Sequence, residues 1–285
     1  MKQNAIALGT FDGLHLGHRA VLEQICRPQF HPVAVTFRVP PRFLKDNRQL
    51  RLLLTPDEKE KRLREMGISV FNIDFDRVKD ILPVEFLDYL INTYDPALIA
   101  TGFNFRFGKN AQGSVVTISE YCKKRDVEFV MVDPIVADSD IVSSTRIRTL
   151  IERGSVNEAA ALLGYEFSFC GEVIHGNERG RTIGFPTINQ VYPQNLVLPR
   201  FGVYKSKTFL QGKWYNSVSN IGIRPTFKNG MISCESHIIN YSGNAYGKTA
   251  VIKLKDFLRD EIKFENIEQL RKQISADISG VCGGS

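Results

Sequence analysis

The chain has 285 residues, of which 43% are hydrophobic and 24% charged, and its formal net charge is +6 at pH 7. This composition is ordinary for a globular protein and excludes disorder as the default state. The length favours two domains over one. The basic excess suits a protein that handles phosphates but is too small to indicate nucleic-acid binding, so we expect no nucleic-acid partner.

The five cysteines are spread along the chain without any Cys-x-x-Cys pair, so neither a zinc site nor a disulfide framework is indicated. The odd cysteine count and the absence of a signal peptide favour the reducing cytoplasm. No segment is long and apolar enough to span a bilayer, and we expect no membrane partner. The sequence leaves the oligomeric state open.

The first half of the chain alternates apolar runs with helical patterns. Residues 4–9 and 31–37 are predicted as buried strands, and residues 55–67 as a helix that Thr55 can cap, with a capping box. The charge run DEKEKRLRE within this helix is interpreted as a solvated face. Alternating strands and helices predict a Rossmann-like parallel sheet covered on both faces, an α/β domain over residues 1–164.

The pattern changes near Gly164. From Glu166 onward, short apolar-alternating stretches are broken by Gly, Pro and Asn, which is typical of an antiparallel β-barrel. We therefore predict a second domain over residues 165–285. In its closing segment an apolar stripe recurs at helical spacing, which predicts a terminal helix docked on the barrel. The stripe consists of Ile267, Leu270, Ile274 and Ile278.

The stretch GTFDGLHLGH directly follows the first predicted strand. In an open parallel sheet such a loop lies at the carboxyl edge, where nucleotides bind. Gly9, Gly13 and Gly17 let the backbone approach a phosphate, and His15 and His18 can each donate a hydrogen bond to phosphoryl oxygens. Two alternatives are a zinc pair, which no third ligand supports, and a pair of purely structural histidines.

The stretch SSTRIR precedes an apolar-periodic helix near the end of the first domain. An ordinary N-cap needs only one hydroxyl. Ser143, Ser144 and Thr145, together with exposed backbone N–H groups and Arg146, predict a polyphosphate cradle.

The stretch TGFNFRFGKN carries three alternating phenylalanines with Asn104 between the first two. The alternation fits a half-buried strand as well as it fits contact with a ligand. Its flanking glycines place it at a strand end, on the same edge as the histidine loop.

A second glycine-rich loop, HGNERGRTIGFPTIN, lies in the barrel domain. Gly176, Gly180 and Gly184 make a loop that can approach a phosphate, although hairpins also use glycine. Thr187 and Asn189 lie two residues apart, so on a strand they face the same side. Their oxygens are hard ligands that suit Mg²⁺ bridging phosphates.

The stretch CESHIIN places Glu235 in an otherwise apolar-alternating strand. A carboxylate there faces solvent or has a chemical task, because burial without a partner is costly. Because the PTIN sequence is also present, we favour Glu235 as a general base that takes a proton from a hydroxyl.

These motifs together resemble a known family. The histidine loop and SSTRIR resemble the nucleotidyltransferases with a His-x-Gly-His signature. Over essentially the whole chain the sequence resembles the bacterial bifunctional riboflavin kinase/FMN adenylyltransferases, or FAD synthetases. The residues that carry this resemblance are GTFDGLHLGH, GFNFRFG, SSTRIR, GRTIGFPTIN, NIGIRPTF, CESH and FLRDEIKF, in the family's order.

In the barrel domain the resemblance implies transfer of the γ-phosphate of MgATP to riboflavin, giving FMN. It implies that Glu235 is the catalytic base and that Thr187 and Asn189 form the magnesium shell. Arg259 matches a family position expected near the kinase substrates, although it could equally pair with Asp260 or Glu261. The residues assigned to ATP or flavin binding in this domain are Gly176, Gly180, Arg181, Gly184, Pro186 and Arg259.

In the α/β domain the resemblance implies in-line attack of FMN on the α-phosphate of a second ATP, giving FAD and pyrophosphate. His15, His18 and Arg146 would stabilise the transition state without transferring a proton. The residues assigned to ATP binding in this domain are Gly9, Phe11, Gly17, Asn104, Ser143, Ser144 and Thr145.

The sequence departs from the family pattern at two positions near this second reaction. Where the family often has Phe-Glu-Pro-His-Pro, this chain has FRVPP over residues 37–41, and Asn104 stands where an Asp is frequent. The FRVPP loop helps to shape the flavin pocket in the family. The change could weaken FMN binding, alter the preferred flavin redox state, or have no effect.

Three alternatives remain open at this stage. The first is a kinase-only enzyme with a degenerate front domain. The second is a nucleotidyltransferase for another phosphorylated substrate, which would not need the GFPTIN sequence. The third is a flavin- or RNA-binding regulator without catalysis.

Overall fold

The computed structural model describes residues 2–45, 50–176, 179–223 and 231–282. The chain divides into two compact units, unit 1 (Met1–Arg146) and unit 2 (Ile147–Ser285). The division falls inside helix α7 (Ser144–Arg153), whereas the sequence pattern changes at residue 164. Between these positions lies α8 (Val156–Leu163), which packs against a strand of unit 2.

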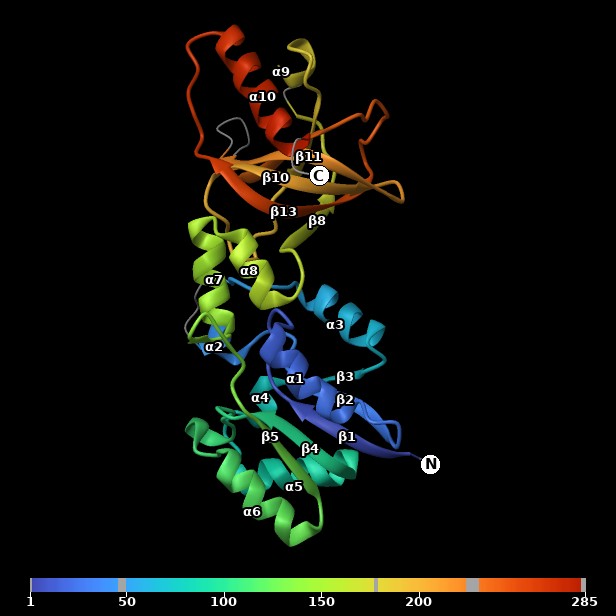
Figure 1. The fold of residues 1–285 in the computed structure, drawn as a ribbon. Coiled ribbons are helices and arrows are strands. Elements are labelled where there is room, and N and C mark those ends of the chain that lie inside the picture. Colours follow the sequence, from blue (N-terminus) through green and yellow to red (C-terminus); the bar gives the residue numbers. More distant parts are fainter. Residues whose placement is uncertain (1, 46–49, 177–178, 224–230, 283–285) are drawn as a thin grey trace. The chain divides into compact units, whose positions relative to one another are not determined.

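Unit 1 is built on a five-stranded, fully parallel sheet (Figure 1). Its strand order is β3-β2-β1-β4-β5, which reverses direction at β1 as in doubly wound folds. The strands are β1 (Gln3–Leu8), β2 (Phe30–Thr36), β3 (Ser69–Asn72), β4 (Pro96–Gly102) and β5 (Glu128–Val132). The longer helices are α1 (Leu16–Ile25), α3 (Pro56–Glu65), α5 (Pro83–Tyr94) and α6 (Val115–Arg125).

Shorter elements complete unit 1. They are α2 (Pro41–Lys45), α4 (Phe75–Val78), the 3₁₀ turn η1 (Lys109–Ala111) and a small hairpin of β6 (Val136–Ala137) and β7 (Asp140–Ile141). The expected helix over residues 55–67 is confirmed as α3: Thr55 Oγ1 accepts a bond from the Glu58 backbone N–H at 3.3 Å. Glu58 does not complete the predicted capping box, and its carboxylate accepts from Arg62 Nε at 2.9 Å.

The two faces of the sheet carry different side chains. Ile6 and Leu8 of β1 pack into a core with residues of α5 and α6. Ala5 and Ala7 alternate with them and are fully buried on the opposite face, against which α1 packs. The predicted α/β layer with helices on both faces is therefore confirmed.

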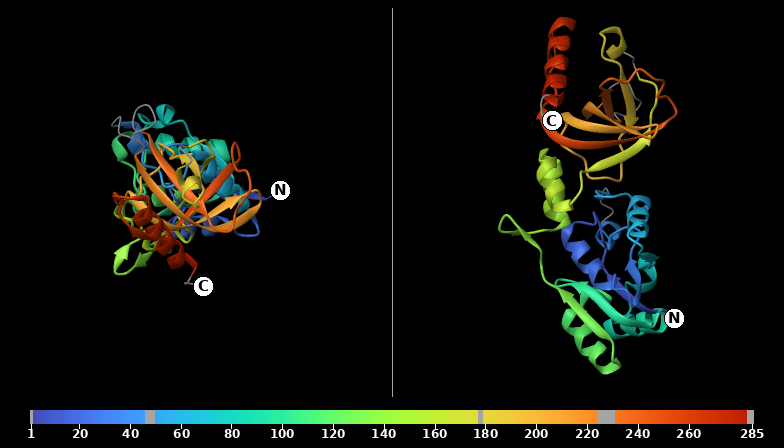
Figure 2. Two further views of the ribbon diagram at one scale, coloured as in Figure 1. Left: turned by 90° about the horizontal axis from the view of Figure 1, so that it is seen from above. Right: turned by 45° about the vertical axis from the view of Figure 1, so that its right-hand side comes forward.

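Unit 2 contains a six-stranded antiparallel sheet that curls into a nearly closed barrel (Figure 2). The strand order is β8-β13-β10-β11-β12-β9. The two edge strands approach each other, because Ile174 N–H donates to Asn189 O at 2.8 Å and Gln190 Nε2 donates to Gly171 O at 2.7 Å. The strands are β8 (Ser168–Glu172), β9 (Thr187–Val191), β10 (Gly202–Leu210), β11 (Lys213–Ile223), β12 (Ile232–Ile238) and β13 (Thr249–Arg259).

The terminal helix α10 (Ile267–Cys282) packs on β10 and β11, as predicted. Its contact with the barrel involves Ile278 and Val281, which join a cluster with Val203 and Val218. Ile267, at the start of the predicted stripe, is 63% exposed. The helix therefore docks through its C-terminal half. Among the described residues, no helix is long and apolar enough to cross a bilayer.

Candidate functional site

Unit 1 holds a cavity of about 530 Å³ at the carboxyl ends of β1, β4 and β5. This is the edge at which open parallel sheets bind ligands. Four segments that are far apart in the sequence line it: the histidine loop, the loop after β2, the turn after β4 and the segment before α7. The sequence-predicted residues in its wall are Gly9, Phe11, His15, Gly17, His18, Asn104, Ser143, Ser144 and Thr145.

The two histidines lie against each other at the start of α1. His15 is the N-cap residue, and its Nδ1 accepts a bond from the His18 backbone N–H at 3.4 Å. The two rings are stacked with centroids 3.6 Å apart, and His15 is buried. Both residues also border the cavity, so one structural contact orients two side chains of the cavity wall.

The glycines of this loop make room for rings as well as for a ligand. A Cβ on Gly9 would lie 2.9 Å from the Phe11 ring, and one on Gly17 would lie 3.3 Å from the His15 ring. Phe11 has a φ of 48°, a left-handed conformation that costs free energy in a bulky residue. Strain of this kind concentrates at functional sites.

The segment before α7 is tied to the histidine loop. Ser144 Oγ donates to the Asp12 carbonyl at 2.9 Å, and Ser143 Oγ accepts from the Arg146 backbone N–H at 3.3 Å. Ser143 therefore caps the helix, and Ser144 links the segment to the histidine loop. They also line the cavity, where the N-terminus of α7 favours negative charge.

Arg146 was predicted to bind phosphate, but its side chain lies against the β6–β7 hairpin. It is not part of the cavity wall, and its guanidinium donates to Ala137 O at 2.7 Å and Asp140 O at 3.1 Å in the β6–β7 hairpin. Its contact with a phosphate stays a prediction. Arg148, which the sequence analysis did not single out, is a buried arginine of the same helix.

The GFNFRFG segment is a turn and not a strand. β4 ends at Gly102, whose carbonyl accepts from the Phe105 backbone N–H at 3.1 Å. The half-buried strand interpretation is therefore wrong for residues 103–106, because the chain reverses directly after the sheet edge. The turn puts Phe103, Asn104 and Phe105 on the cavity wall.

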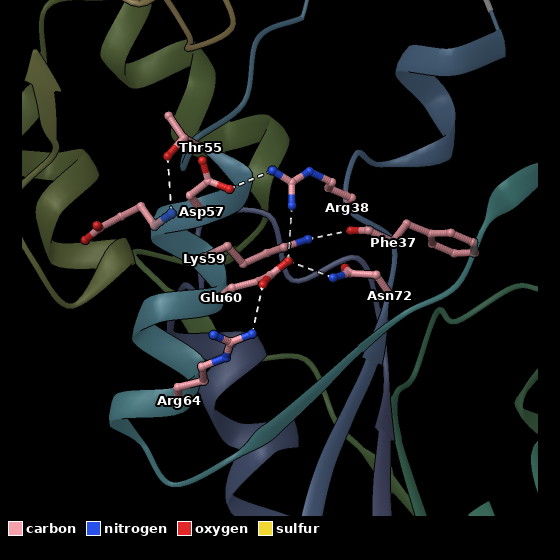
Figure 3. Close-up of polar contacts among 9 residues, drawn as sticks. Phe37, Arg38, Thr55, Asp57, Lys59, Glu60, Arg64 and Asn72 are labelled. Carbon is pink, nitrogen blue, oxygen red and sulfur yellow. Dashed lines mark hydrogen bonds and ion pairs between the residues drawn. The ribbon is translucent and has the colours of Figure 1, made fainter. Parts of the chain in front are cut away.

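The unusual FRVPP loop is only partly in the wall. Phe37, Pro40 and Pro41 line the cavity, whereas Arg38 does not. Arg38 points to helix α3, where it pairs with Asp57 at 2.6 Å and Glu60 at 3.5 Å (Figure 3). The sequence analysis also missed three cationic side chains in the wall, which are Arg42, Lys79 and Arg106.

In unit 2 the strand register brings the predicted kinase residues together. Glu235 of β12 lies directly opposite Asn189 of β9, and His237 lies opposite Thr187. Residues at alternate positions share a face, so Thr187, Asn189, Glu235 and His237 lie on one face of the two strands. The residues that alternate with them on β12, Cys234 and Ser236, are fully buried on the other face.

The loop before β9 is held close to this face. His237 Nδ1 lies 2.8 Å from Pro186 O, which fixes the peptide before Thr187. A Cβ on Gly180 would lie 2.3 Å from Phe185 O, so only glycine allows α9 (Arg179–Thr182) to fold back on this segment. Gly184 has a φ of 88°, as a left-handed turn requires. The Arg181 side chain lies outside the described part of the chain.

The oxygen donors of this face fit a hard cation. Thr187 and Asn189 supply a hydroxyl and an amide oxygen, and Glu235 lies opposite Asn189 on the paired strand. Within the described residues, no group of three or more His, Cys, Asp or Glu could hold a metal by themselves. Mg²⁺ usually takes one or two protein ligands and completes its shell with water and substrate phosphates.

Arg259, at the end of β13, forms a buried ion pair. Its Nη2 lies 2.8 Å from Asp277 Oδ2 of α10, and its Nε donates to Asp277 Oδ1 at 3.1 Å. The carboxylate of Asp260 pairs instead with Arg200 at 2.7 Å. The predicted substrate contact of Arg259 stays a prediction.

Comparison with known proteins assigns the family. Residues 1–146 match the model described as FAD synthetase, and residues 163–281 match the model described as riboflavin kinase. The chain belongs to the bifunctional riboflavin kinase/FMN adenylyltransferase family.

Relatives in this family match almost the whole chain. The protein of that name from Listeria monocytogenes is 34% identical over 95% of this chain and 89% of its own. The Bacillus subtilis protein is 33% identical over 96% of this chain and 90% of its own. A solved structure from Streptococcus pneumoniae, described as a macrolide-efflux protein, covers 100% of this chain and 96% of its own, with a TM-score of 0.90 and 29% identity.

Proposed function

We propose that this chain makes FAD from riboflavin in two steps, one in each unit. Unit 2 transfers the γ-phosphate of ATP to the 5′-hydroxyl of riboflavin, giving FMN and ADP. Unit 1 joins FMN to the α-phosphate of a second ATP, giving FAD and pyrophosphate. The observation that carries the proposal is that two family models match separate parts of the chain, each with its own assembled group of polar residues.

In unit 2 the chemistry needs an oriented hydroxyl and neutralised phosphates more than covalent help. Glu235 takes the proton of the riboflavin hydroxyl as the oxygen attacks the γ-phosphorus. Thr187 and Asn189 would hold Mg²⁺ through their side-chain oxygens. When bound, the cation offsets negative charge that develops during transfer. His237 keeps Pro186, and with it the start of β9, in place.

In unit 1 the attacking group is already ionised, so no general base is required. A phosphate oxygen of FMN attacks the α-phosphorus, and the bond to pyrophosphate breaks in line. His15 and His18 donate hydrogen bonds to the α-phosphoryl oxygens as charge shifts onto them. Arg42, Lys79 and Arg106 place three cationic side chains in the cavity wall, although Arg42 also pairs with Asp12 and Lys79 with Asp76. Ser143 and Ser144 bring the N-terminus of α7 to the same wall.

Paired substitutions separate the two reactions in one protein. Glu235→Gln keeps the shape of the side chain and removes the base, so riboflavin phosphorylation should fall about 10²- to 10⁴-fold. Conversion of added FMN to FAD should stay within about twofold, because Glu235 lies outside the unit 1 cavity. Glu172→Gln, an exposed carboxylate of the same barrel, is the matched control and should leave both rates unchanged.

His18→Ala should produce the reverse pattern. FAD formation should fall about 10²- to 10³-fold while FMN formation persists. His31→Ala is the matched control, because His31 is exposed on β2 and lies outside the cavity wall. Flavins are separated by chromatography during incubation with riboflavin, ATP and Mg²⁺. If either substitution lowers the rates of FMN formation and FAD formation equally, the model of two separate sites is contradicted.

The same time course decides between this proposal and its alternatives. FMN that accumulates without FAD, with oxidised and reduced flavin alike, would favour a kinase whose FRVPP loop no longer accepts FMN. Flavin binding without any product would favour a non-catalytic regulator. FMN first and FAD afterwards is the result that we expect.

A further inference from the structure

Lys59 of α3 is the only buried lysine among the residues that the structure describes, with 3% of its surface exposed. An ammonium group in such a place is rare unless it has partners. Lys59 is not part of the cavity wall, and neither catalytic proposal uses it. Its neighbour Lys61 on the same helix shows the ordinary arrangement, with 65% of its side chain exposed.

The ammonium group of Lys59 joins two loops of the unit 1 cavity. Its Nζ donates to Phe37 O at 2.6 Å and to Thr10 O at 3.3 Å (Figure 3 shows the first bond). Phe37 begins the FRVPP loop after β2, and Thr10 lies in the histidine loop after β1. Both residues line the cavity. One buried ammonium group therefore binds the backbone of both loops, beside the bond from Thr36 Oγ1 to Thr10 O at 3.2 Å.

Other contacts of α3 act in the same direction. Leu53 N–H, just before the helix, donates to Asp12 Oδ1 at 2.9 Å in the histidine loop. Arg38 of the FRVPP loop pairs with Asp57 and Glu60 on the outer side of the helix. The exposed pairs contribute little because water competes for them. Lys59 provides the buried, charge-assisted contact, which is the stronger kind.

The charges around Lys59 come from three elements. Asp12 in the histidine loop and Glu60 on α3 favour the ammonium form, and Arg38 in the FRVPP loop opposes it. Burial outweighs these effects and lowers the pKa of Lys59 from 10.5 to about 8. The group therefore titrates within a range where the enzyme can be assayed.

We propose that Lys59 is a positioning residue for FAD formation, whose ammonium group holds the histidine loop and the FRVPP loop at the separation that FMN and ATP require. The inference rests on the proposed function of unit 1. Loss of the shared donor removes both hydrogen bonds, so the loops loosen and the reacting phosphates lose alignment. FAD formation in unit 1 then falls, while FMN formation in unit 2 does not.

The test compares three variants of the full chain. Lys59→Met removes the charge at similar length and should lower kcat/KM for FAD formation about 10- to 100-fold, mainly through kcat. Lys61→Met changes an exposed lysine two residues further along the same helix. It should change kcat/KM for FAD formation less than about twofold. Lys59→Arg keeps a cation that does not titrate below pH 12. Riboflavin phosphorylation in the same samples reports whether unit 2 is intact.

Rescue by the conservative variant separates positioning from simple structural support. Lys59→Arg keeps a donor at this position and should recover part of the kcat/KM for FAD formation that Lys59→Met loses. Burial lowers the pKa of Lys59, so deprotonation favours the folded arrangement, and alkaline pH should not loosen the loops. A Lys59→Met variant whose kcat/KM for FAD formation stays within about twofold of the wild type overturns the proposal.

A readout without turnover covers the remaining outcomes. Amide hydrogen exchange of the segments 9–14 and 37–39, corrected for intrinsic rates, should quicken in Lys59→Met but not in Lys61→Met. Exchange that is unaffected in both loops overturns the inference even if Lys59→Met is inactive or unstable. A wild-type protein that makes no FAD contradicts the proposed function instead, and the exchange result still decides the role of Lys59.

Discussion

The Arg259–Asp277 ion pair offers a sharp prediction, because the family resemblance and the structure assign Arg259 to different partners. Asp277→Asn removes the negative charge and keeps the shape. Only 6% of the Asp277 side chain and 18% of the Arg259 side chain are exposed, so the guanidinium would be left largely buried without a counter-charge. Breaking a fully buried pair costs about 3–5 kcal/mol. Arg259 keeps its bond to Asp260 O at 3.1 Å.

Because of that remaining bond and the partial exposure, we expect Asp277→Asn to lower the free energy of unfolding of unit 2 by about 2–3 kcal/mol. The matched control is Asp260→Asn, which breaks the Arg200–Asp260 pair. Its side chains are 47% and 61% exposed, so the cost should stay below about 1 kcal/mol. The chain has one tryptophan, Trp214, on β11 of the barrel. Its fluorescence during urea unfolding therefore follows unit 2 separately from unit 1.

Equal costs for the two substitutions would refute this reasoning, because they would mean that burial does not set the value of the pair. Riboflavin phosphorylation provides the second measurement. If Arg259 also contacts the kinase substrates, Asp277→Asn should raise their KM as the guanidinium moves, and Asp260→Asn should not. Unchanged KM values with a large loss of stability would assign Arg259 to the docking of α10 alone.

Two further predictions concern helix α3. Arg38→Glu restores the acid that the family often has, but places it against Asp57 and Glu60. We expect a higher KM for FMN in FAD formation and a change in the free energy of unfolding below about 1 kcal/mol in thermal unfolding. A lower KM for FMN would contradict this reasoning. For Lys59, the folded pKa of about 8 lies below the unfolded value of 10.5, so the unfolded state binds more protons between these values. The free energy of unfolding of the wild type relative to Lys59→Met should therefore rise with pH from 8 to 10.5, by up to about 3 kcal/mol. Urea unfolding followed by circular dichroism measures it. A stability difference between the two proteins that does not depend on pH would contradict the buried charge.

The sequence predicts the layers of this fold well, because each layer depends on local periodicity. The alternation of apolar strands and capped helices gives the parallel sheet, and the short alternating stretches give the barrel. The position of α10 is less well predicted, since a helical stripe does not say which of its turns will touch the barrel. Ile278 is in contact and Ile267 is exposed.

The sites were predictable where chemistry and strand ends coincide. His15, His18 and Asn104 reach one cavity because their segments follow strands of the same sheet, and Ser143 and Ser144 join it from the segment after the β6–β7 hairpin. Side-chain direction was not predictable. Arg146 sits in the right motif, yet it donates to carbonyl groups of the β6–β7 hairpin. A loop arginine has several carbonyl partners within reach, and the sequence does not rank them.

Lys59 shows the same limit for charge patterns. The run DEKEKRLRE was interpreted as a solvated face, which holds for Lys61, Arg64 and Glu65. It is wrong for Lys59, because the helix turns that one position toward the backbone carbonyl groups of two loops. Periodicity identifies apolar residues on a buried face, but an amphipathic lysine at such a position looks like its exposed neighbours.

The departure of FRVPP from the family pattern can now be divided into two parts with different consequences. Arg38 is outside the cavity wall, and its charge is taken up by two acids of α3. Pro40 and Pro41 are in the wall and fix the loop backbone, since proline restricts φ. Phe37 is tied through its carbonyl to Lys59. Where the family often has an acidic side chain and a histidine, this loop has two adjacent prolines and contacts with α3. A flavin that is recognised by its ring shape would tolerate this change, whereas one that needed a loop carboxylate would not.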